Sequence, residues 1–165
     1  MASKKGIIIT IIILAAITAA SFMIWQMPTN LQMSVVVSDF NSHIIGIDER
    51  YKMISNANDE AFEQMINGEI SPDEYISIAE ISSSQINSQI IELVESNATD
   101  EWIESYLNDL ESLRSYNSYI RETIVLANLI NGNAGIDEKS DILIKIEQLK
   151  QESKEYSKLS ISSRP

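Results

Sequence analysis

The sequence predicts an all-α protein, with a single N-terminal transmembrane helix followed by an antiparallel up-down-up-down four-helix bundle. Three observations lead to this fold class. Residues 6–25 are apolar except for Thr10, Thr18 and Ser21. From residue 38 onward, apolar residues recur at alternating steps of four and three, which is the spacing of one face of a helix. Short stretches rich in asparagine, glycine, serine and proline divide this pattern into four segments, and short turns between long helices favour antiparallel neighbours.

The apolar stretch predicts a transmembrane anchor over residues 6–26. A helix needs ~20 such residues to cross the hydrocarbon core. Lys4 and Lys5 precede the stretch, whereas residues 26–30 carry no charge. Because basic residues favour the cytoplasmic side, we expect residues 1–5 to be a cytoplasmic tail and the C-terminal domain to be extracytoplasmic. The expected location is the cell membrane, with the lipid bilayer contacted through residues 6–26.

Two kinds of processing are alternatives to a permanent anchor. A conventional signal peptidase would cut after the small residues 18–20. Lys4, Lys5 and Gly6, followed directly by Ile7, resemble the class III signal peptide of archaeal pilins, which is cut after the glycine. This resemblance implies processing at Gly6 and a pilin-like subunit, although Ile11 stands where the bacterial pilin pattern has an acidic residue.

The charge of the domain restricts its partners. The chain has a formal net charge of -12, and removing the two N-terminal lysines from the count leaves 10 basic and 24 acidic side chains, or -14. Such a surface repels nucleic acid, which we exclude as a partner. The chain has no cysteine, which excludes disulfides, thiolate nucleophiles and cysteine metal sites.

The first bundle helix follows a connector over residues 27–37, whose β-branched run has no second strand with which to pair. The helix is expected to start after a cap at Ser38 or Asp39 and to end at the Asn67-Gly68 pair. Its inward stripe is Phe40, Ile44, Ile47, Tyr51, Ile54, Asn58, Ala61 and Met65.

The second helix opens with the capping box Ser71-Pro72-Asp73-Glu74 and ends before a turn at residues 97–99. Its stripe is Ile76, Ala79, Ser83, Ile86, Ile90 and Leu93. We expect Thr99 to cap the third helix, which ends in a loop over residues 131–135. The third stripe is Ile103, Tyr106, Leu110, Leu113, Asn117, Ile120, Ile124 and Ala127.

The fourth helix opens near Asp137, with Ile136 placed to staple it. Its stripe is Ile142, Ile146, Leu149 and Tyr156, and Lys150 is expected on the solvated face, where its substitution should matter little. We expect fraying from Leu159 onward, so that residues 38–160 form an acidic helical bundle domain and residues 161–165 a tail.

The sequence offers no constellation of catalytic residues. His43, the only histidine, lies outside its helix's stripe and is expected at the surface or its boundary. A di-iron bundle needs Glu-x-x-His pairs, which the sequence lacks. Residues 131–137 lack the glycine and the closing glutamate of a calcium loop. We therefore expect no enzymatic activity, no catalytic residue, no cofactor and no metal site.

Three asparagines are of interest for other reasons. Asn58 and Asn117 stand on apolar stripes, where a polar residue can fix the register of helices, and they equally fit hydrogen bonds to each other or to nearby backbone. Asn97-Ala98-Thr99 is an N-glycosylation acceptor sequence in an expected surface turn. Asn97 is therefore a candidate modification site.

Large apolar residues also occur off the stripes, namely Ile45, Phe62, Ile66, Ile78, Ile81, Leu107, Leu126 and Leu129. Most of them would widen a buried stripe, whereas any that remain exposed would mark an interface. This surplus favours an anchored interaction or scaffold protein that binds an envelope protein or associates with itself. A sensor-type ligand-binding ectodomain is an alternative.

The chain as a whole, from MASKKGIII through SPDEYISIAEISSSQINSQIIELVESNA to the terminal SSRP, resembles small membrane-anchored helical envelope proteins of ammonia-oxidising archaea. The resemblance implies an archaeal envelope location and agrees with the predicted anchor. It supplies no site residues. It adds one further alternative, an accessory subunit of the membrane ammonia monooxygenase complex.

Overall fold

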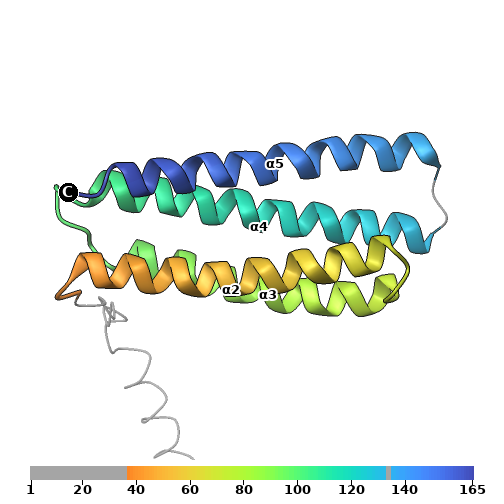
Figure 1. Cartoon of the computed structure of the whole chain (residues 1–165), viewed down its shortest axis with the longest axis horizontal. Helices are drawn as coiled ribbons and strands as arrows, with labels where there is room; N and C mark the ends of the chain where they lie inside the picture. The colour runs from red at the N-terminus through yellow and green to blue at the C-terminus, as the bar shows by residue number, and fades with distance from the viewer. Residues whose placement is uncertain (1–36, 133–134) are drawn as a thin grey trace, which may run out of the picture. The chain divides into compact units, whose positions relative to one another are not determined.

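The computed structural model describes residues 37–132 and 135–165, which form four helices and no strand (Figure 1). Helix α2 spans Phe40–Ile66, α3 Pro72–Glu95, α4 Ile103–Asn131 and α5 Ile136–Ser162. Consecutive helices run antiparallel along the domain (Figure 1). The prediction of an all-α domain with four successive helices is therefore confirmed for this part of the chain.

The predicted anchor, the first ten residues of the connector, the processing site at Gly6 and the side chain of Ile136 lie outside the described residues. Within the described ranges, none of the helices combines the length and the apolarity that crossing a bilayer requires.

Helices α2 and α3 begin where the sequence predicts. The Asp39 carboxylate accepts the backbone N–H of Ser42 at 3.1 Å, and the Ser71 hydroxyl oxygen accepts the N–H of Glu74 at 3.2 Å. Each cap satisfies one of the N–H groups that a helix leaves free at its start. Helix α2 ends at Ile66 and is followed by Gly68, whose φ of +75° favours glycine and whose N–H donates to the Met65 carbonyl at 3.0 Å.

Thr99 does not cap α4, contrary to the prediction. Its carbonyl instead accepts the N–H of Trp102 at 2.8 Å, and α4 begins at Ile103 without a side-chain cap. The Trp102 ring centroid lies 6.5 Å from that of Phe40 and 6.4 Å from that of Tyr106. Burial of the indole against two helices thus determines the start of α4, and this packing outweighs the local preference of threonine for a cap.

Helix α5 extends beyond the expected fraying point. It continues through Ser162, and Arg164 forms an ion pair of 2.5 Å with Asp48 of α2. The residues assigned to a C-terminal tail, 161–165, are therefore held against the bundle. Arg164 is the reason, because its charged fork reaches a carboxylate on a helix that is distant in sequence.

The core lies between the four helices, and the predicted stripes point into it with two exceptions. Ile103 at the start of α4 is 48 % exposed, because the helix only begins there. On α3 the fully buried line is Tyr75, Ala79, Ser82, Ile86, Gln89 and Leu93, so that Ile76, Ser83 and Ile90 are half-buried beside it. Ala79, Ile86 and Leu93 thus lie in the buried line as predicted, and the other three predicted positions each lie one residue after a buried one.

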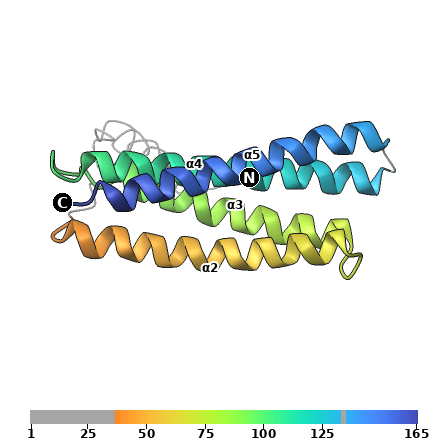
Figure 2. The same cartoon turned by 45° about the horizontal axis from the view of Figure 1, so that its top comes forward.

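Small hydroxylated residues lie between α4 and α5, and this helix pair has the most extensive contact of the domain. Ser112 donates to the Ser153 carbonyl at 2.9 Å, and Ser153 donates to the Ser112 carbonyl at 2.9 Å. One heptad away, Ser105 donates to the Ser160 carbonyl at 2.9 Å. Serine has little volume, so the two backbones approach closely, and Figure 2 shows α5 crossing α4.

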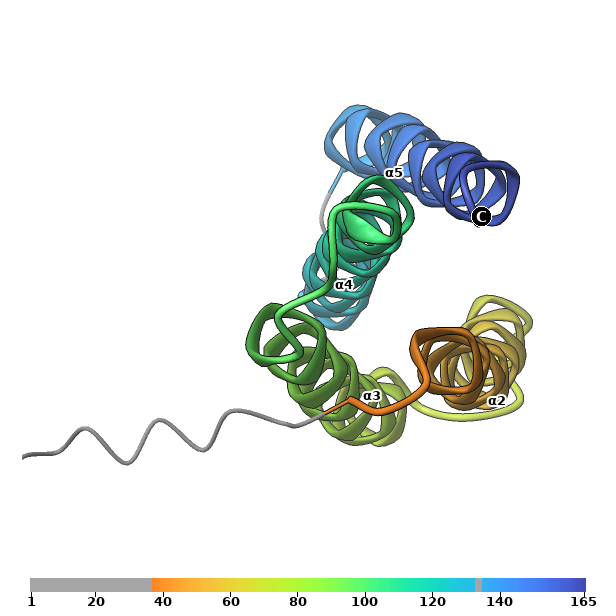
Figure 3. The ribbon, with the colours of Figure 1, turned by 90° about the vertical axis from the view of Figure 1, so that its left-hand side faces the viewer.

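In the end view, the helices follow one another around the domain in the order α2, α3, α4, α5 (Figure 3). Helices α2 and α5 are the first and the last in this order, and their Cα atoms nowhere lie within 8 Å of each other. Long side chains connect them instead. Tyr51 reaches Ser153 at 3.1 Å and Lys150 reaches Asp59 at 2.7 Å.

Candidate functional site

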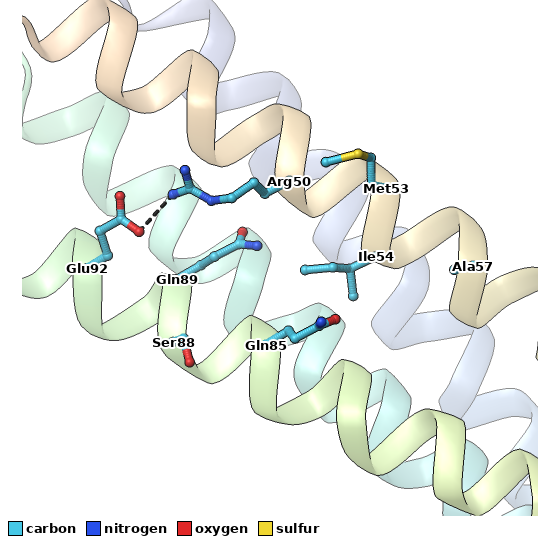
Figure 4. A pocket seen from close by; sticks show the side chains of 8 residues that line it. All are labelled: Arg50, Met53, Ile54, Ala57, Gln85, Ser88, Gln89 and Glu92. Carbon is cyan, nitrogen blue, oxygen red and sulfur yellow. Dashed lines mark hydrogen bonds and ion pairs between the residues drawn. The ribbon is translucent and has the colours of Figure 1, made fainter.

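A groove of about 490 Å³ lies between α2 and α3 (Figure 4). Its lining residues recur at helical spacing on each helix, so that each helix turns one continuous face toward the groove. They are Arg50, Met53, Ile54 and Ala57 of α2 and Gln85, Ser88, Gln89 and Glu92 of α3. Pockets of this size accept small organic ligands, and such pockets are commonly apolar with a few polar groups.

A chain of polar contacts closes one end of the groove. Arg50 bonds Glu92 at 2.7 Å, as the dashed line in Figure 4 marks, and the Nε2 atom of His43 lies 3.1 Å from the same carboxylate. The Nδ1 atom of His43 lies 2.8 Å from the hydroxyl of Tyr106, which in turn donates to the Phe40 carbonyl at 3.1 Å. With its proton directed to the Phe40 carbonyl, the Tyr106 hydroxyl oxygen offers an acceptor to Nδ1 of His43.

His43 therefore lies at the boundary of the core, as predicted. Its side chain is 14 % exposed, and its ring stacks on Tyr106 with 5.8 Å between the centroids. Burial, with smaller effects of nearby charges led by Asp109, raises the pKa of Tyr106 to about 12. The tyrosine hydroxyl consequently stays protonated at neutral pH and acts as a hydrogen-bond donor.

Gln89 of α3 is a nearly buried polar residue beside the groove. The residue is 4 % exposed, and its Oε1 atom has no hydrogen-bond partner among the described residues. In Figure 4 the Gln89 amide lies between the two helices, on the side that faces α2. A buried amide oxygen without a hydrogen-bond partner costs about 1–3 kcal/mol, and because this atom is inaccessible to solvent, a molecule in the open groove does not contact it.

A second polar cluster lies on the opposite side of α2, around Asp59. Tyr116 and Tyr119 donate to one oxygen of this carboxylate at 3.0 and 2.9 Å, and Lys150 bonds the other at 2.7 Å. Burial, and then the negative charge of Asp59, raise the pKa of both tyrosines above their usual value. Both therefore remain donors, and the cluster ties α2 to α4 and α5. Lys150 was expected on the solvated face, and it is instead half-buried in this contact.

Asp109 of α4 is a buried acid without a full set of partners. It is 3 % exposed, and its Oδ2 atom has no hydrogen-bond partner among the described residues. Burial raises its pKa to about 7, the negative charge of Asp48 adds to the rise, and Arg164 opposes it. Asp109 does not line the groove, so we assign it to the stability of the domain.

The two asparagines on apolar stripes do not bond each other. Asn117 donates to Asn87 at 2.7 Å and accepts from Ser83 at 2.6 Å, which connects α4 to α3. Asn58 is fully buried beside Tyr75, and neither polar atom of its side chain makes a hydrogen bond of good geometry within the described ranges. Only Asn117 thus has the register-fixing contacts that its position suggests.

The candidate modification site Asn97 lies at an apolar pocket of about 380 Å³ between the end of α3 and the start of α4. Asn97 is exposed, has a φ of +49° and donates to the Glu95 carbonyl at 3.1 Å. The pocket is lined by Leu93, Val94, Ala98, Ile103, Tyr106, Leu107 and Leu110 as well. Of these, Val94, Ile103 and Leu107 are 60 %, 48 % and 54 % exposed, which is unusual for neighbouring large apolar residues.

The predicted surplus of apolar residues divides between core and surface. Leu126 is 2 % exposed, and Phe62 and Ile78 pack against the core. Large exposed fractions remain at Ile45, Ile66, Ile81 and Leu107, whereas Leu129 is intermediate. In the sequence, the two sets look alike, and only the position of each residue relative to the neighbouring helices separates them.

Sequence reasoning missed Gln89 and the four serines between α4 and α5, because polar residues were read as solvated. A usable signal exists for the serines, which recur in step seven as Ser105 and Ser112 and as Ser153 and Ser160. Within the part of the chain that the structure describes, no group of three or more histidine, cysteine or acidic side chains is placed to hold a metal ion. Comparisons with protein families, with curated proteins and with solved structures found no match to this chain.

Proposed function

We propose that this protein is a membrane-anchored, extracytoplasmic interaction or scaffold protein that has no enzymatic activity of its own. Residues 6–26 serve as the single-pass anchor in this proposal, and the acidic helical domain presents the binding surface. The apolar run and the preceding lysines in the sequence support the anchor and its orientation.

The observation that carries the proposal is the apolar pocket between the end of α3 and the start of α4, with its exposed rim of Val94, Ile103 and Leu107. Contiguous exposed apolar residues mark interfaces more often than free surface. Acidic residues adjoin this rim in sequence, namely Glu95, Asp100, Glu101 and Glu104. The fitting partner is therefore an envelope protein that inserts an apolar side chain surrounded by basic residues.

The absence of cysteine from the sequence allows a direct test. A benzophenone label on Glu104→Cys, next to the rim, should crosslink to a specific envelope protein in intact membranes, and the same label on Gln148→Cys of α5 should not. The additional change Leu107→Glu should abolish the crosslink, because a charge cannot be buried in an apolar pocket without a partner. A product of twice the chain's mass would identify the partner as a second copy.

Equal labelling from both positions, or a crosslink that survives Leu107→Glu, would show that the rim is not the interface. Recovery of the uncrosslinked monomer alone, with labels of several lengths, would remove the basis of a scaffold role. Intact-mass measurement separates the anchored form from the pilin-like alternative, since processing at Gly6 would leave Ile7 as the first residue.

Glycosylation at Asn97 would compete with this interaction. Asn97 itself lines the pocket, so a glycan there would cover the exposed rim. We therefore expect partner binding and a glycan at Asn97 to exclude each other. Substitution Thr99→Ala removes the acceptor sequence, and it should increase crosslinking only if native chains carry the glycan.

A second candidate function is a sensor-type ligand-binding ectodomain. The groove between α2 and α3 favours it, because a ligand bound there would contact both helices and change how they pack. Its test is the binding of a small molecule to that groove.

A further inference from the structure

We propose that His43 is a pH switch that regulates the apolar pocket between the end of α3 and the start of α4. The proton that this histidine gains or loses decides whether its ring bonds both of these helices or only one of them. The inference rests on the function proposed above, because it concerns the regulation of the same pocket. It makes the binding of the envelope partner stronger at low pH.

His43 contacts one polar group on each of the two helices that form the pocket. Its Nδ1 atom lies 2.8 Å from the Tyr106 hydroxyl of α4, and its Nε2 atom lies 3.1 Å from Oε1 of Glu92 on α3. The other oxygen of Glu92 accepts from Arg50 at 2.7 Å, which leaves Oε1 facing the histidine. The imidazole of α2 thus lies between a hydroxyl of α4 and a carboxylate of α3.

The number of protons on the imidazole decides how many of these contacts are hydrogen bonds. Tyr106 directs its own proton to the Phe40 carbonyl, so both neighbours of the ring offer acceptors, and a neutral ring has a single N–H for them. Nε2 of His43 is inaccessible to solvent and makes no bond of good geometry to Glu92 despite the short distance. A charged ring has two N–H groups, and rotation of the partly exposed Glu92 carboxylate would complete the second bond.

Both neighbours of His43 belong to the walls of the pocket. Tyr106 lines it directly, and Glu92 immediately precedes Leu93, which also lines it. The ring of Tyr106 packs against Trp102, with 6.4 Å between the centroids, so a change at the hydroxyl reaches the start of α4. Protonation of His43 therefore fixes the two ends relative to each other, which preorganises the pocket for an inserted apolar side chain.

Other charged groups face this contact from the neighbouring elements. They are Asp39 and Arg50 at α2, Glu92 on α3, Asp109 on α4 and Arg164 after α5. Burial raises the pKa of Asp109 to about 7, so this acid also changes its charge near neutral pH and has to be separated from His43 by mutation. The charge that His43 gains lies 3.1 Å from Glu92, which offsets it, and the acidic rim keeps its attraction for a basic partner.

The first measurement follows the pocket without a partner. Because the chain has a single histidine, ¹⁵N-labelled histidine gives one imidazole in the NMR spectrum of the full chain in phosphatidylcholine nanodiscs. With ¹³C-labelled leucine methyl groups, the Leu93 and Leu107 signals should move between ~pH 5.5 and ~pH 8 with the same midpoint as the imidazole. Leu126, which is 2 % exposed and does not line the pocket, should stay in place.

Matched variants identify the groups that carry the coupling. Tyr106→Phe keeps the ring but removes the hydroxyl, so the imidazole should still titrate while the Leu107 signal no longer follows it. Asp109→Asn removes the other group that titrates near neutral pH, and the common midpoint should persist. If Tyr106→Phe disturbs the Leu126 signal, Glu92→Gln replaces it, because Glu92 is partly exposed, and the pocket signals should then cease to follow the imidazole.

The second measurement adds the partner. With the benzophenone label on Glu104→Cys in intact membranes, lowering the pH from ~8 to ~5.5 should raise the crosslinked yield about threefold to tenfold, as one additional hydrogen bond would. His43→Gln cannot gain the charge, so its yield should be the same at both pH values.

Pocket signals that stay in place, or that move with a midpoint different from that of the imidazole, would overturn the switch even if the partner is crosslinked. Coupling that survives in folded Tyr106→Phe and Glu92→Gln variants would overturn it as well. A pH dependence that persists in His43→Gln, or that disappears in Asp109→Asn, would assign the response to another group. Coupled pocket signals without a specific crosslink at either pH would refute the proposed interface and leave the switch in place.

Discussion

The raised pKa of the buried Asp109 makes the free energy of unfolding of the domain depend on pH. The folded protein holds the proton of this carboxyl up to about pH 7, whereas the ordinary pKa is 3.8, and burial is the main cause. Between these two pH values the folded state binds more protons than the unfolded state. Raising the pH through this interval therefore lowers the free energy of unfolding, and the stability that the protonated acid provides is complete only below the lower value.

The first prediction follows from this decrease in the free energy of unfolding with rising pH. Asp109→Asn has no ionisable group, so the contribution of this site to the pH dependence should disappear and the free energy of unfolding at ~pH 8 should rise by about 2–4 kcal/mol. Urea unfolding of the full chain, followed by circular dichroism at ~pH 5 and ~pH 8, measures both effects. Asp141→Asn, at an exposed position of α5, is the control and should leave the profile unchanged. Retention of the same pH dependence in Asp109→Asn would assign it to another group.

A second prediction at this scale compares two isoleucines of α4 that the sequence pattern treats alike. Ile120 is fully buried and Ile103 is 48 % exposed. Ile120→Ala should lower the free energy of unfolding by about 2–5 kcal/mol, because it removes buried methyl groups and leaves a cavity. Ile103→Ala should cost less than ~1 kcal/mol. Similar losses for the two variants in thermal unfolding would contradict the position of α4 in the bundle.

At the scale of elements, the serines between α4 and α5 decide how close two helices lie. The reciprocal hydroxyl-to-carbonyl bonds of Ser112 and Ser153 need backbones at short distance, and a larger side chain has no space there. Helices α2 and α5, in contrast, are joined by long side chains such as Lys150 and Arg164. The backbones of α4 and α5 are thus in close contact, whereas α2 and α5 are connected by polar side chains.

The third prediction tests this close contact. Ser112→Leu should lower the free energy of unfolding by about 1–3 kcal/mol or more, because the added carbons force α4 and α5 apart. Ser118→Leu, at an exposed position of the same helix, should be nearly neutral. Urea unfolding of both variants supplies the measurement. A well-tolerated leucine at position 112 would mean that the serines do not set the distance between the helices.

For the whole molecule, the fourth prediction is that residues 37–165 fold without the preceding segment. Four helices with a common core supply the burial that a cooperative domain of this size needs. This fragment should show a helical circular dichroism spectrum and a single unfolding transition. A broad, non-cooperative transition would indicate that the N-terminal segment is required for the fold. Protease added outside intact cells should digest the same domain if the N-terminus is cytoplasmic.

The sequence by itself determined the number of helices, their order and most of their ends. Caps such as Asp39 and Ser71 and the turn glycine Gly68 act through neighbouring backbone groups, so local chemistry is enough to read them. Heptad spacing likewise identified the inward face of α2, because apolar residues on one face of a helix have to be buried somewhere.

Only the tertiary structure decided which polar residues are buried and which apolar residues remain exposed. Gln89 and Ser112 are polar residues of types that are usually exposed. They are buried because another helix packs over them. Ile103 and Leu107 are large apolar residues of types that are usually buried, yet no helix of the described domain covers them. These assignments depend on contacts between residues far apart in the chain, and the spacing of residues along one helix carries no information about such contacts.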